Sequence, residues 1–187
     1  IIVRNSKKGE SFTALDDKKY TLQKDMCVIS DKSGILGLGG VIGGTRSGTE
    51  IDTKNILLES AYFYPSSVRK TSKKLGLETD AKYRFERGID PNSVMDGLKI
   101  ATDLILNICG GEASKFNISG KKEYKNKLID LELDKFKKII GFSITENETK
   151  KILNSLGFAT KSGKKKLKVL IPTWRPDVNQ EIDLIEE

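Results

Sequence analysis

The segment MCVISDKSGILGLGGVIGG, residues 26–44, decides the fold expected for the first part of the chain. It begins with a short apolar run over 26–30, continues through the turn-forming residues 31–34, and ends in the glycine-rich stretch 37–44. Short β-prone runs that alternate with turn signals are typical of hairpins rather than helices. Residues 1 to about 60 are therefore predicted to form short strands broken by turns.

The flanks of this segment extend the same pattern and then change it. Upstream, residues 13–22 carry Asp-Asp-Lys-Lys between two β-prone flanks and predict a hairpin. Downstream, residues 55–59 read as a further strand, and from about Pro65 the pattern becomes helical. Asp90-Pro91 supplies an N-cap and a first-turn proline for a helix ended by Gly110-Gly111. Its apolar stripe consists of Val94, Leu98, Ala101, Leu104, Ile105 and Ile108.

A polar segment without periodicity, residues 121–127, predicts a linker. Beyond it, residues 129–133 alternate apolar and charged side chains, which indicates a strand with one polar face. A short helix over 136–140 follows. Thr145-Glu146-Asn147-Glu148 then matches a capping box, and the helix that it starts is expected to bury an apolar face before Gly157. That face consists of Ile152, Leu153 and Leu156.

The end of the chain completes a second domain. Residues 161–166 predict a hairpin tip before a strand over 167–171, and a last helix follows. Strand, helix, helix, hairpin and final helix make a small α+β domain, winged-helix-like in outline. The chain as a whole is predicted to be α+β, with one domain over residues 1–122 and a second over 123–187.

Composition excludes several kinds of chemistry. The 187 residues include 33 Lys+Arg, 26 Asp+Glu and no histidine, for a formal charge of +7. Without histidine, Ser-His-Asp and Cys-His mechanisms within this chain are excluded, as are imidazole bases and His-ligated metals. The cysteines, Cys27 and Cys109, make neither a disulfide framework nor a zinc site. The positive charge supports RNA contact only weakly.

Targeting signals are not found in the sequence. It starts at Ile1 without a signal-peptide pattern, and no apolar run approaches the roughly 20 residues that span a bilayer. The missing initiator methionine and the stop inside a predicted helix suggest a piece of a longer protein. We expect a cytoplasmic protein with free thiols and no membrane association.

Two features of the first domain allow both a functional and a structural interpretation. The glycines of residues 37–44 let a backbone approach a ligand and present successive amides to an anion, but the pattern alone favours tight strand packing and a hairpin. The stretch is neither a Walker A loop nor a dinucleotide fingerprint. Glu59 ends an apolar run, where a carboxylate is paired, hydrogen-bonded or functional, unless it faces solvent at a strand end.

Charged clusters carry similar alternatives. Arg84 and Arg87 lie three residues apart and so share a helix face. They form either a site that contacts an anion or RNA, or a surface ion-pair cluster with Phe85 turned inward. A terminal acidic group suits Mg²⁺ through its oxygen ligands, or forms an acidic helix start beside the helix dipole. It consists of Asp177, Asp183, Glu186 and Glu187.

The ordered motifs resemble the β subunits of bacterial phenylalanine–tRNA ligases. They are LLESAYF at 57–63, ETDA at 78–81, RFERGIDP at 84–91, LGF at 156–158, PTWRPD at 172–177 and DLIEE at 183–187. The resemblance implies that residues 1–122 are most of an α/β tRNA-editing domain, a mixed sheet with helices, that hydrolyses Tyr-tRNA(Phe). Residues 123–187 resemble the small domain that follows, leading into the catalytic-like region.

The resemblance also implies roles for single residues. Glu59 matches a pocket glutamate that binds the tyrosine hydroxyl, and Gly43, Thr79 and Ala81 match other residues that line the editing pocket. A family histidine of the same pocket lies upstream of the part represented here, so the piece by itself is expected to be inactive. No catalytic residue is assigned in this chain.

Cofactors and partners follow from the same resemblance. Asp177, Asp183, Glu186 and Glu187 match ligands of a Mg²⁺ ion shared with the α subunit and absent from the isolated piece. The implied assembly is an α2β2 heterotetramer that binds tRNA(Phe) and uses ATP as a substrate to attach phenylalanine. The alternative is a non-catalytic RNA-binding or subunit-assembly module.

Overall fold

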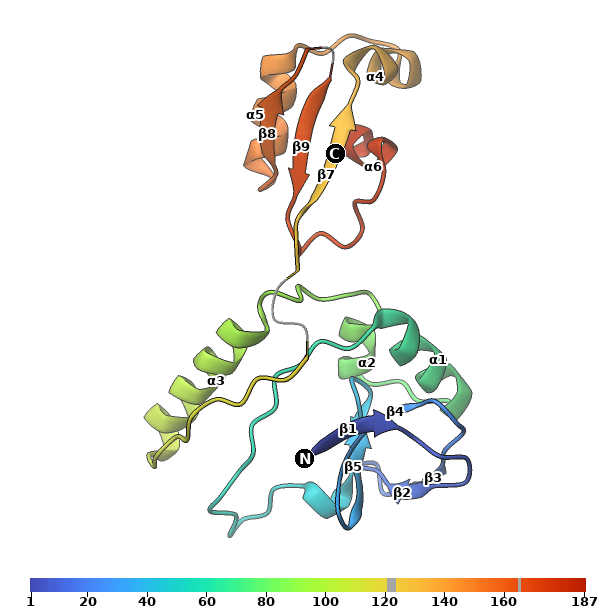
Figure 1. The fold of residues 1–187 in the computed structure, drawn as a ribbon, viewed down its shortest axis with the longest axis vertical. Coiled ribbons are helices and arrows are strands. Elements are labelled where there is room, and N and C mark those ends of the chain that lie inside the picture. The colour runs from blue at the N-terminus through green and yellow to red at the C-terminus, as the bar shows by residue number, and fades with distance from the viewer. Residues whose placement is uncertain (121–123, 165) are drawn as a thin grey trace. The chain divides into compact units, whose positions relative to one another are not determined.

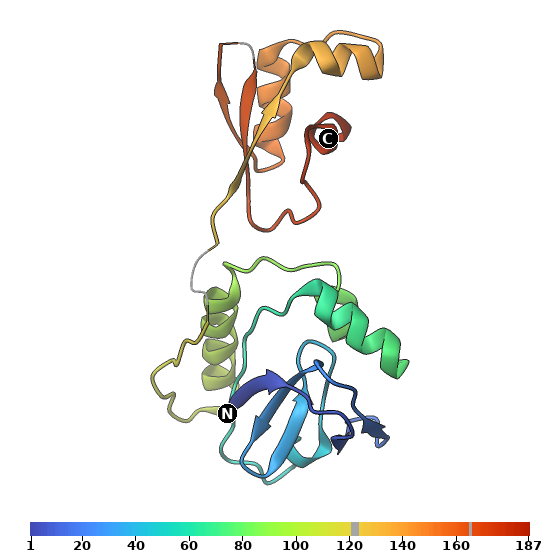
Figure 2. The ribbon, with the colours of Figure 1, turned by 45° about the vertical axis from the view of Figure 1, so that its right-hand side comes forward.

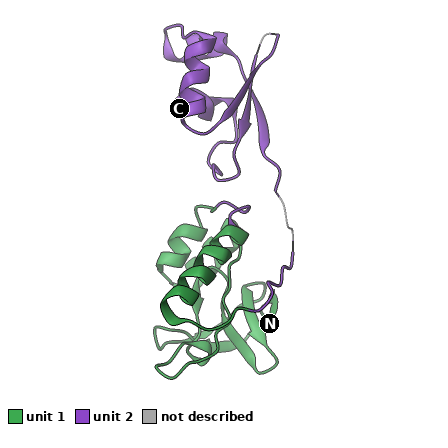
Figure 3. Ribbon diagram, turned by 90° about the vertical axis from the view of Figure 1, so that its left-hand side faces the viewer, with its two compact units in different colours: residues 1–89, 94–113 green, residues 90–93, 114–187 purple. Residues whose placement is uncertain are grey.

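The computed structural model describes residues 1–120, 124–164 and 166–187, and they divide into two compact units (Figure 3). Unit 1 comprises residues 1–89 and 94–113, and unit 2 comprises 90–93 and 114–187. Each unit has its own core of buried apolar side chains, with no residue in common. The α+β class is confirmed, because each unit combines helices with a sheet.

The predicted boundary between the domains falls at residues 122 and 123, outside the described residues, and it stays a prediction. Residues 121–123 of the predicted linker lie outside them as well.

Unit 1 contains a four-stranded sheet in the order β1-β4-β5-β6 and a separate two-stranded sheet (Figures 1 and 2). All of its described strand pairs are antiparallel, whereas the resemblance led us to expect a mixed sheet. Short connections explain the antiparallel β4–β5 and β5–β6 pairs, because a parallel pair needs a long crossover. The strands are β1 (Ile2–Asn5), β2 (Ser11–Thr13), β3 (Lys19–Thr21), β4 (Cys27–Asp31), β5 (Gly34–Leu38) and β6 (Ile42–Gly43).

The strand predictions for unit 1 are confirmed in two places and wrong in one. Strands β2 and β3 form the hairpin predicted over 13–22, and β4 matches the strand predicted over 26–30. The strand predicted over 55–59 is not formed, and Leu57 within it is 70% exposed. An apolar run becomes a strand only when a neighbouring strand takes up its amide and carbonyl groups, and this run has none among the described residues.

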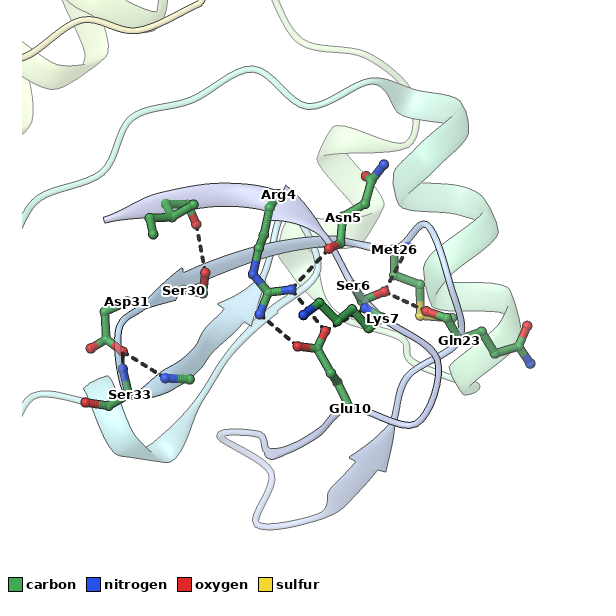
Figure 4. A network of polar contacts seen from close by, with 12 residues as sticks. Arg4, Asn5, Ser6, Lys7, Glu10, Gln23, Met26, Ser30, Asp31 and Ser33 are labelled. Atoms are coloured by element: carbon green, nitrogen blue, oxygen red, sulfur yellow. Dashed lines mark hydrogen bonds and ion pairs between the residues drawn. The ribbon is translucent and has the colours of Figure 1, made fainter.

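Polar contacts hold the start of unit 1 together (Figure 4). The Arg4 guanidinium donates to both carboxylate oxygens of Glu10 at 2.9 and 3.0 Å. The buried Ser6 hydroxyl donates to the Gln23 carbonyl at 2.6 Å and accepts the Met26 amide at 3.0 Å. Ser6 therefore fixes the turn that joins β3 to β4.

Three α-helices and one 3-10 helix complete unit 1. Helix α1 begins with Pro65 in its first turn, ends at Gly76 with a left-handed φ of 65°, and buries Val68 against the sheet core. The helix predicted after Asp90-Pro91 is present, but its first residue is Val94 and none of its side chains is buried. Figures 1 and 2 show it apart from α1 and α2. The helices are η1 (Thr45–Ser47), α1 (Pro65–Leu75), α2 (Asp80–Phe85) and α3 (Val94–Cys109).

An ion pair ties η1 to the β4–β5 turn and gives a pH-dependent signal. The Arg46 guanidinium donates to both Asp31 oxygens at 2.8 and 3.1 Å, which lowers the pKa of that carboxyl from 3.8 to about 2. Because the folded-state pKa is lowered, the pair stabilises unit 1 above the unfolded value, and this contribution is lost as pH falls from about 4 through 2.

We expect a carboxyl-carbon NMR titration to place the Asp31 midpoint near 2, and Arg46→Gln to return it toward 3.8. An unchanged midpoint in the Arg46→Gln protein would show that the guanidinium is not the cause.

Unit 2 is built on a three-stranded antiparallel sheet in the order β7-β9-β8, with α5 beside β8 and α6 beside β7 (Figure 1). Alternate residues of β9 are buried, so Leu167, Val169 and Ile171 form its core face. The predicted α+β content is present, and the winged-helix-like outline stays a prediction. The elements are β7 (Lys127–Leu131), α4 (Leu133–Ile140), α5 (Glu146–Ser155), β8 (Ala159–Ser162), β9 (Leu167–Ile171) and α6 (Glu181–Glu186). Lys165 of the predicted hairpin tip lies outside the described residues.

For helix α5 of unit 2, one sequence prediction is confirmed and another is confirmed only in part. The capping box predicted at Thr145 and Glu148 is confirmed. Of the face expected to be buried, only Leu153 is, while Ile152 is 41% exposed and Leu156 37%. A single short sheet covers only part of a helix, so the outer apolar positions stay in contact with water.

Gly157 closes this helix under the ring of Trp174. Its φ of +87° is left-handed, and a Cβ there would lie 2.7 Å from the indole ring. Both facts make glycine necessary at this position.

Among the described residues, no helix is both long enough and apolar enough to cross a bilayer.

Candidate functional site

The glycine-rich stretch of unit 1 owes part of its composition to strand packing. Gly37 pairs with Gly43 across β5 and β6, and a Cβ on Gly37 would lie 3.1 Å from the Gly43 Cα. A Cβ on Gly44 would lie 2.7 Å from the Leu36 carbonyl oxygen. Side chains at these positions would push the backbones apart. The packing interpretation therefore accounts for Gly37 and Gly44.

Aromatic side chains pack on the middle of the same stretch. A Cβ on Gly39 would lie 2.6 Å from the Phe63 ring, and Gly40 has a left-handed φ of 70°. Phe63 in turn meets Phe85 of α2 edge to face, with ring centroids 5.2 Å apart. This packing anchors residues 59–63 beside the glycines.

Glu59 lies on that anchored segment and is partly withdrawn from water. The residue as a whole is exposed, yet nearby protein atoms restrict hydration of its carboxyl and raise its pKa. Cys27 of β4 is half-buried, and the pKa of its thiol is raised by burial and then by the negative charge of Glu59. Glu59 is thus close enough to Cys27 for their charges to interact. A carboxylate in such a setting is a strong acceptor for a ligand hydroxyl.

Thr79 caps α2 and ties it to the glycine stretch. Its hydroxyl donates to the Val41 carbonyl at 2.6 Å and accepts the Lys82 amide at 3.0 Å. Ala81 is exposed in the first turn of α2, and a Cβ on Gly43 would meet only the Leu15 side chain. The structure therefore brings Thr79 to the glycine stretch. In the described part of the chain, no hydrogen bond joins Glu59 to Thr79.

Residues 83–87 form the surface ion-pair cluster that was one of the two interpretations of Arg84 and Arg87. Arg87 stacks on Tyr83, with its guanidinium carbon 3.7 Å from the ring centroid, and pairs with Glu86 at 3.3 Å. Phe85 points inward onto Phe63, as that interpretation predicts. Arg84 stays exposed.

The terminal carboxylates of unit 2 are held by an arginine and by backbone amides. The Arg175 guanidinium donates to Asp177 at 2.6 Å and also bonds Glu187, and it lowers the pKa of the Asp177 carboxyl. Asp183 accepts the amides of Asn179 and Gln180 at 2.7 and 2.8 Å, which lowers its pKa. Asp183 therefore caps α6.

This arrangement does not fit a magnesium ion within this chain. The described residues contain no group of three or more carboxylate, cysteine or histidine side chains that could hold a metal. Arg175 takes the place of a cation between Asp177 and Glu187, and the exposed Glu186 makes no ion pair or side-chain hydrogen bond with the described residues. The predicted Mg²⁺ site stays a prediction for the assembled heteromer.

Sequence reasoning missed a basic hollow in unit 1. It has a volume of about 320 Å³ and lies between α1 and the β3–β4 turn. The spacing of Lys70 and Lys74, four apart in a helical segment, was the available signal. The hollow is lined by Lys24, Asp25, Met26, Ser66, Ser67, Lys70, Thr71 and Lys74.

Comparison with known proteins places this architecture in a family. Residues 1–110, more than half of the chain, match the family model of the B3/4 domain. The chain belongs to the B3/4 domain family. Residues 129–187, beyond the B3/4 domain, match the family model of the tRNA synthetase B5 domain.

Curated relatives match the B3/4 domain and the rest of the chain without interruption. The chain is 38% identical to the phenylalanine–tRNA ligase beta subunit of Mesorhizobium japonicum and 40% identical to that of Rhodopseudomonas palustris. Each comparison covers 100% of this chain and 23% of the relative, so the chain spans about a quarter of their length.

A solved structure is also similar to the chain. It is the crystal structure of an N-terminal fragment of the phenylalanyl-tRNA synthetase beta-subunit from Pyrococcus horikoshii, at 16% identity and a TM-score of 0.47. The comparison covers 98% of this chain and 53% of that one.

Proposed function

We propose that the chain is part of a phenylalanine–tRNA ligase β subunit, and that its B3/4 domain takes part in hydrolytic editing of Tyr-tRNA(Phe). The observation that carries the proposal is the uninterrupted match of all 187 residues to such β subunits at 38–40% identity. The matches to the B3/4 and tRNA synthetase B5 domain models, in that order, support it. Its wider role is to support attachment of phenylalanine to tRNA(Phe).

Glu59 is the proposed specificity residue of the editing reaction. Its carboxylate is partly desolvated and lies on the segment that ends at Phe63, so it can accept a hydrogen bond from a tyrosine hydroxyl. Phenylalanine has no such hydroxyl and would leave the carboxylate without that partner, which lets the site discriminate strongly. Gly43, Thr79 and Ala81 are proposed to line the same pocket.

The proposed reaction needs no covalent nucleophile from this chain. A water molecule attacks the ester carbonyl, the bond to the ribose oxygen breaks, and the products are free tyrosine and tRNA. Backbone amides and the terminal hydroxyl of the tRNA assist.

The proposal implies partners and a location. The heteromer contains the α subunit in an α2β2 assembly, binds tRNA(Phe) and uses ATP as a substrate for aminoacylation. The cytoplasm, where such an enzyme meets tRNA, is the proposed compartment. Mg²⁺ binding at Asp177, Asp183, Glu186 and Glu187 would require Arg175 to release the two carboxylates that it holds.

A second candidate is a non-catalytic RNA-binding or subunit-assembly module. The basic hollow of unit 1 favours this alternative, because lysines around a cavity suit phosphate contacts whether or not hydrolysis takes place.

Deacylation of preformed tRNA separates the two candidates. The full-length β subunit assembled with α is expected to hydrolyse Tyr-tRNA(Phe) at least about a hundredfold faster than Phe-tRNA(Phe). A site built to bind a substrate hydroxyl strongly rejects an analogue that lacks it. Release of both amino acids at the rate seen without enzyme, together with tight tRNA binding, would support the module instead.

A further inference from the structure

The basic hollow of unit 1 presents one face of α1 to one turn. Its α1 residues, Ser66, Ser67, Lys70, Thr71 and Lys74, recur at helical spacing and so share a face. Lys24 approaches from the β3–β4 turn. A volume of about 320 Å³ is at the small end of the range for ligand pockets. The hollow therefore suits a small group surrounded by cations.

The three lysines of the hollow have no anionic partner. In the part of the chain that the structure describes, Lys24, Lys70 and Lys74 make no ion pair and donate no side-chain hydrogen bond. Lys70 and Lys74 are four residues apart on a helix, where like charges repel. Asp25 is the one carboxylate that lines the hollow. The net charge of the residues that line the hollow is therefore positive, and a bound anion would relieve the repulsion between the lysines.

A buried hydroxyl without a partner opens into this hollow. Thr71 is only 4% exposed, and no hydrogen bond to its hydroxyl is made by the described residues. Every fully enclosed side-chain nitrogen or oxygen atom in them does have a partner. The Thr71 hydroxyl must therefore reach accessible space, and the hollow is the space that Thr71 lines. An occupant with acceptor oxygens would satisfy it.

The start of α1 adds to the preference for an anion. No side chain caps this helix, and its first turn contains no acidic residue. Ser66 and Ser67 lie in that turn, where the helix dipole favours negative charge, and the Ser67 amide already donates to the Tyr64 carbonyl at 2.9 Å.

Ser6 holds the opposite wall of the hollow in place. Its hydroxyl and backbone bond Gln23, Asp25 and Met26, which surround Lys24 (Figure 4). Four hydrogen bonds fix the backbone of this turn, so binding at Lys24 has to order only its side chain.

We infer that this hollow binds a phosphate group of an RNA strand, with Lys24, Lys70 and Lys74 as its cations and Thr71 as a hydroxyl donor. The RNA source of the phosphate rests on the proposed function, since a tRNA is the phosphate-bearing partner of that reaction. Phosphate recognition by the hollow itself rests on the geometry alone.

The first experiment tests phosphate recognition in the 187-residue chain with pyrophosphate as the probe. Amide NMR signals of Ser66, Ser67, Thr71 and Lys24 are expected to shift in a saturable way. The shifts should be lost in Lys70→Gln/Lys74→Gln and retained in Lys73→Gln. Lys73 is on the same helix and does not line the hollow, and its change removes one positive charge, as each of the two changes in the double variant does. Shifts that are absent, or equally weakened by Lys73→Gln, would overturn the inference.

The second experiment tests the RNA source with tRNA(Phe) and the assembled subunits. The Lys70→Gln/Lys74→Gln protein should bind about tenfold more weakly, and its slope of log Kd against log salt should fall by roughly 1.4, at about 0.7 per lost contact to a single strand. Inorganic phosphate that binds this hollow as tightly as tRNA, or an unchanged slope, would overturn the RNA assignment.

The two proposals fail in different ways. If the wild-type protein hydrolyses Tyr-tRNA(Phe) but binds no phosphate at the hollow, this inference is removed and the proposed function remains. If the hollow binds phosphate but Tyr-tRNA(Phe) is not hydrolysed in preference to Phe-tRNA(Phe), the proposed function is removed and phosphate recognition by the hollow remains.

Discussion

Replacing Glu59 with alanine in the assembled α and β subunits is expected to slow hydrolysis of Tyr-tRNA(Phe) by roughly 10- to 150-fold. This range corresponds to the 1.5–3 kcal/mol of a hydrogen bond to a charged group. The carboxylate lies on the segment that Phe63 anchors over the glycines, and partial desolvation raises its pKa. Such a carboxylate can gain more from a tyrosine hydroxyl than a fully hydrated one can.

The matched control for Glu59→Ala is Glu50→Ala, which removes another exposed carboxylate from the connection between β6 and α1. It should leave hydrolysis unchanged, and both variants should attach phenylalanine at the wild-type rate. Hydrolysis that is equally fast in wild type and Glu59→Ala would remove the role assigned to Glu59. Because the pKa of Glu59 is raised, loss of its ionised form at low pH should begin at a higher pH than for an ordinary glutamate.

Replacing Leu153 with alanine is expected to lower the free energy of unfolding of unit 2 by about 2–5 kcal/mol. The Leu153 side chain is 2% exposed and packs in the cluster that also contains Phe158 and Val169. Truncation leaves a cavity that a short sheet and three small helices cannot fill. Amide hydrogen exchange should quicken throughout β7 and β9.

Two comparisons make the Leu153 prediction specific. Ile152→Ala changes the neighbouring position on the same helix, but Ile152 is 41% exposed, so its cost should be well below that of Leu153→Ala. Exchange in β4 and β5 should not change, because the cores of the two units share no residue. Equal acceleration in β4 and β5 would contradict the separation of the cores.

Local signals explain which parts of the fold the sequence could predict. The hairpin over 13–22 and the capping box at Thr145 depend on residues close together in the chain, and both are present. The run 55–59 has the composition of a strand, but pairing depends on distant residues that no local pattern specifies. The apolar stripe of α3 predicted its helix correctly, yet Ile108 on that stripe is 80% exposed. Periodicity predicts a face and does not say what covers it.

The candidate sites show the same division. The glycine spacing allowed two interpretations, and only the distance from a Gly44 Cβ position to the Leu36 carbonyl shows that packing requires a glycine there. The acidic spacing at the end of the chain suggested a metal, but the sequence did not reveal that Arg175 would bond both Asp177 and Glu187. The hollow around Thr71 combines two segments at least forty residues apart, which sequence spacing could not connect.

The packing of Trp174 over Gly157 has a practical consequence for optical work. Trp174 is the only tryptophan of the chain, and it belongs to unit 2. Its emission therefore reports on unit 2, and a bulkier residue at Gly157 would alter the signal by displacing the indole. Unit 1 contributes no indole fluorescence, so a tryptophan introduced there would give the basic hollow of unit 1 a spectral reporter of its own.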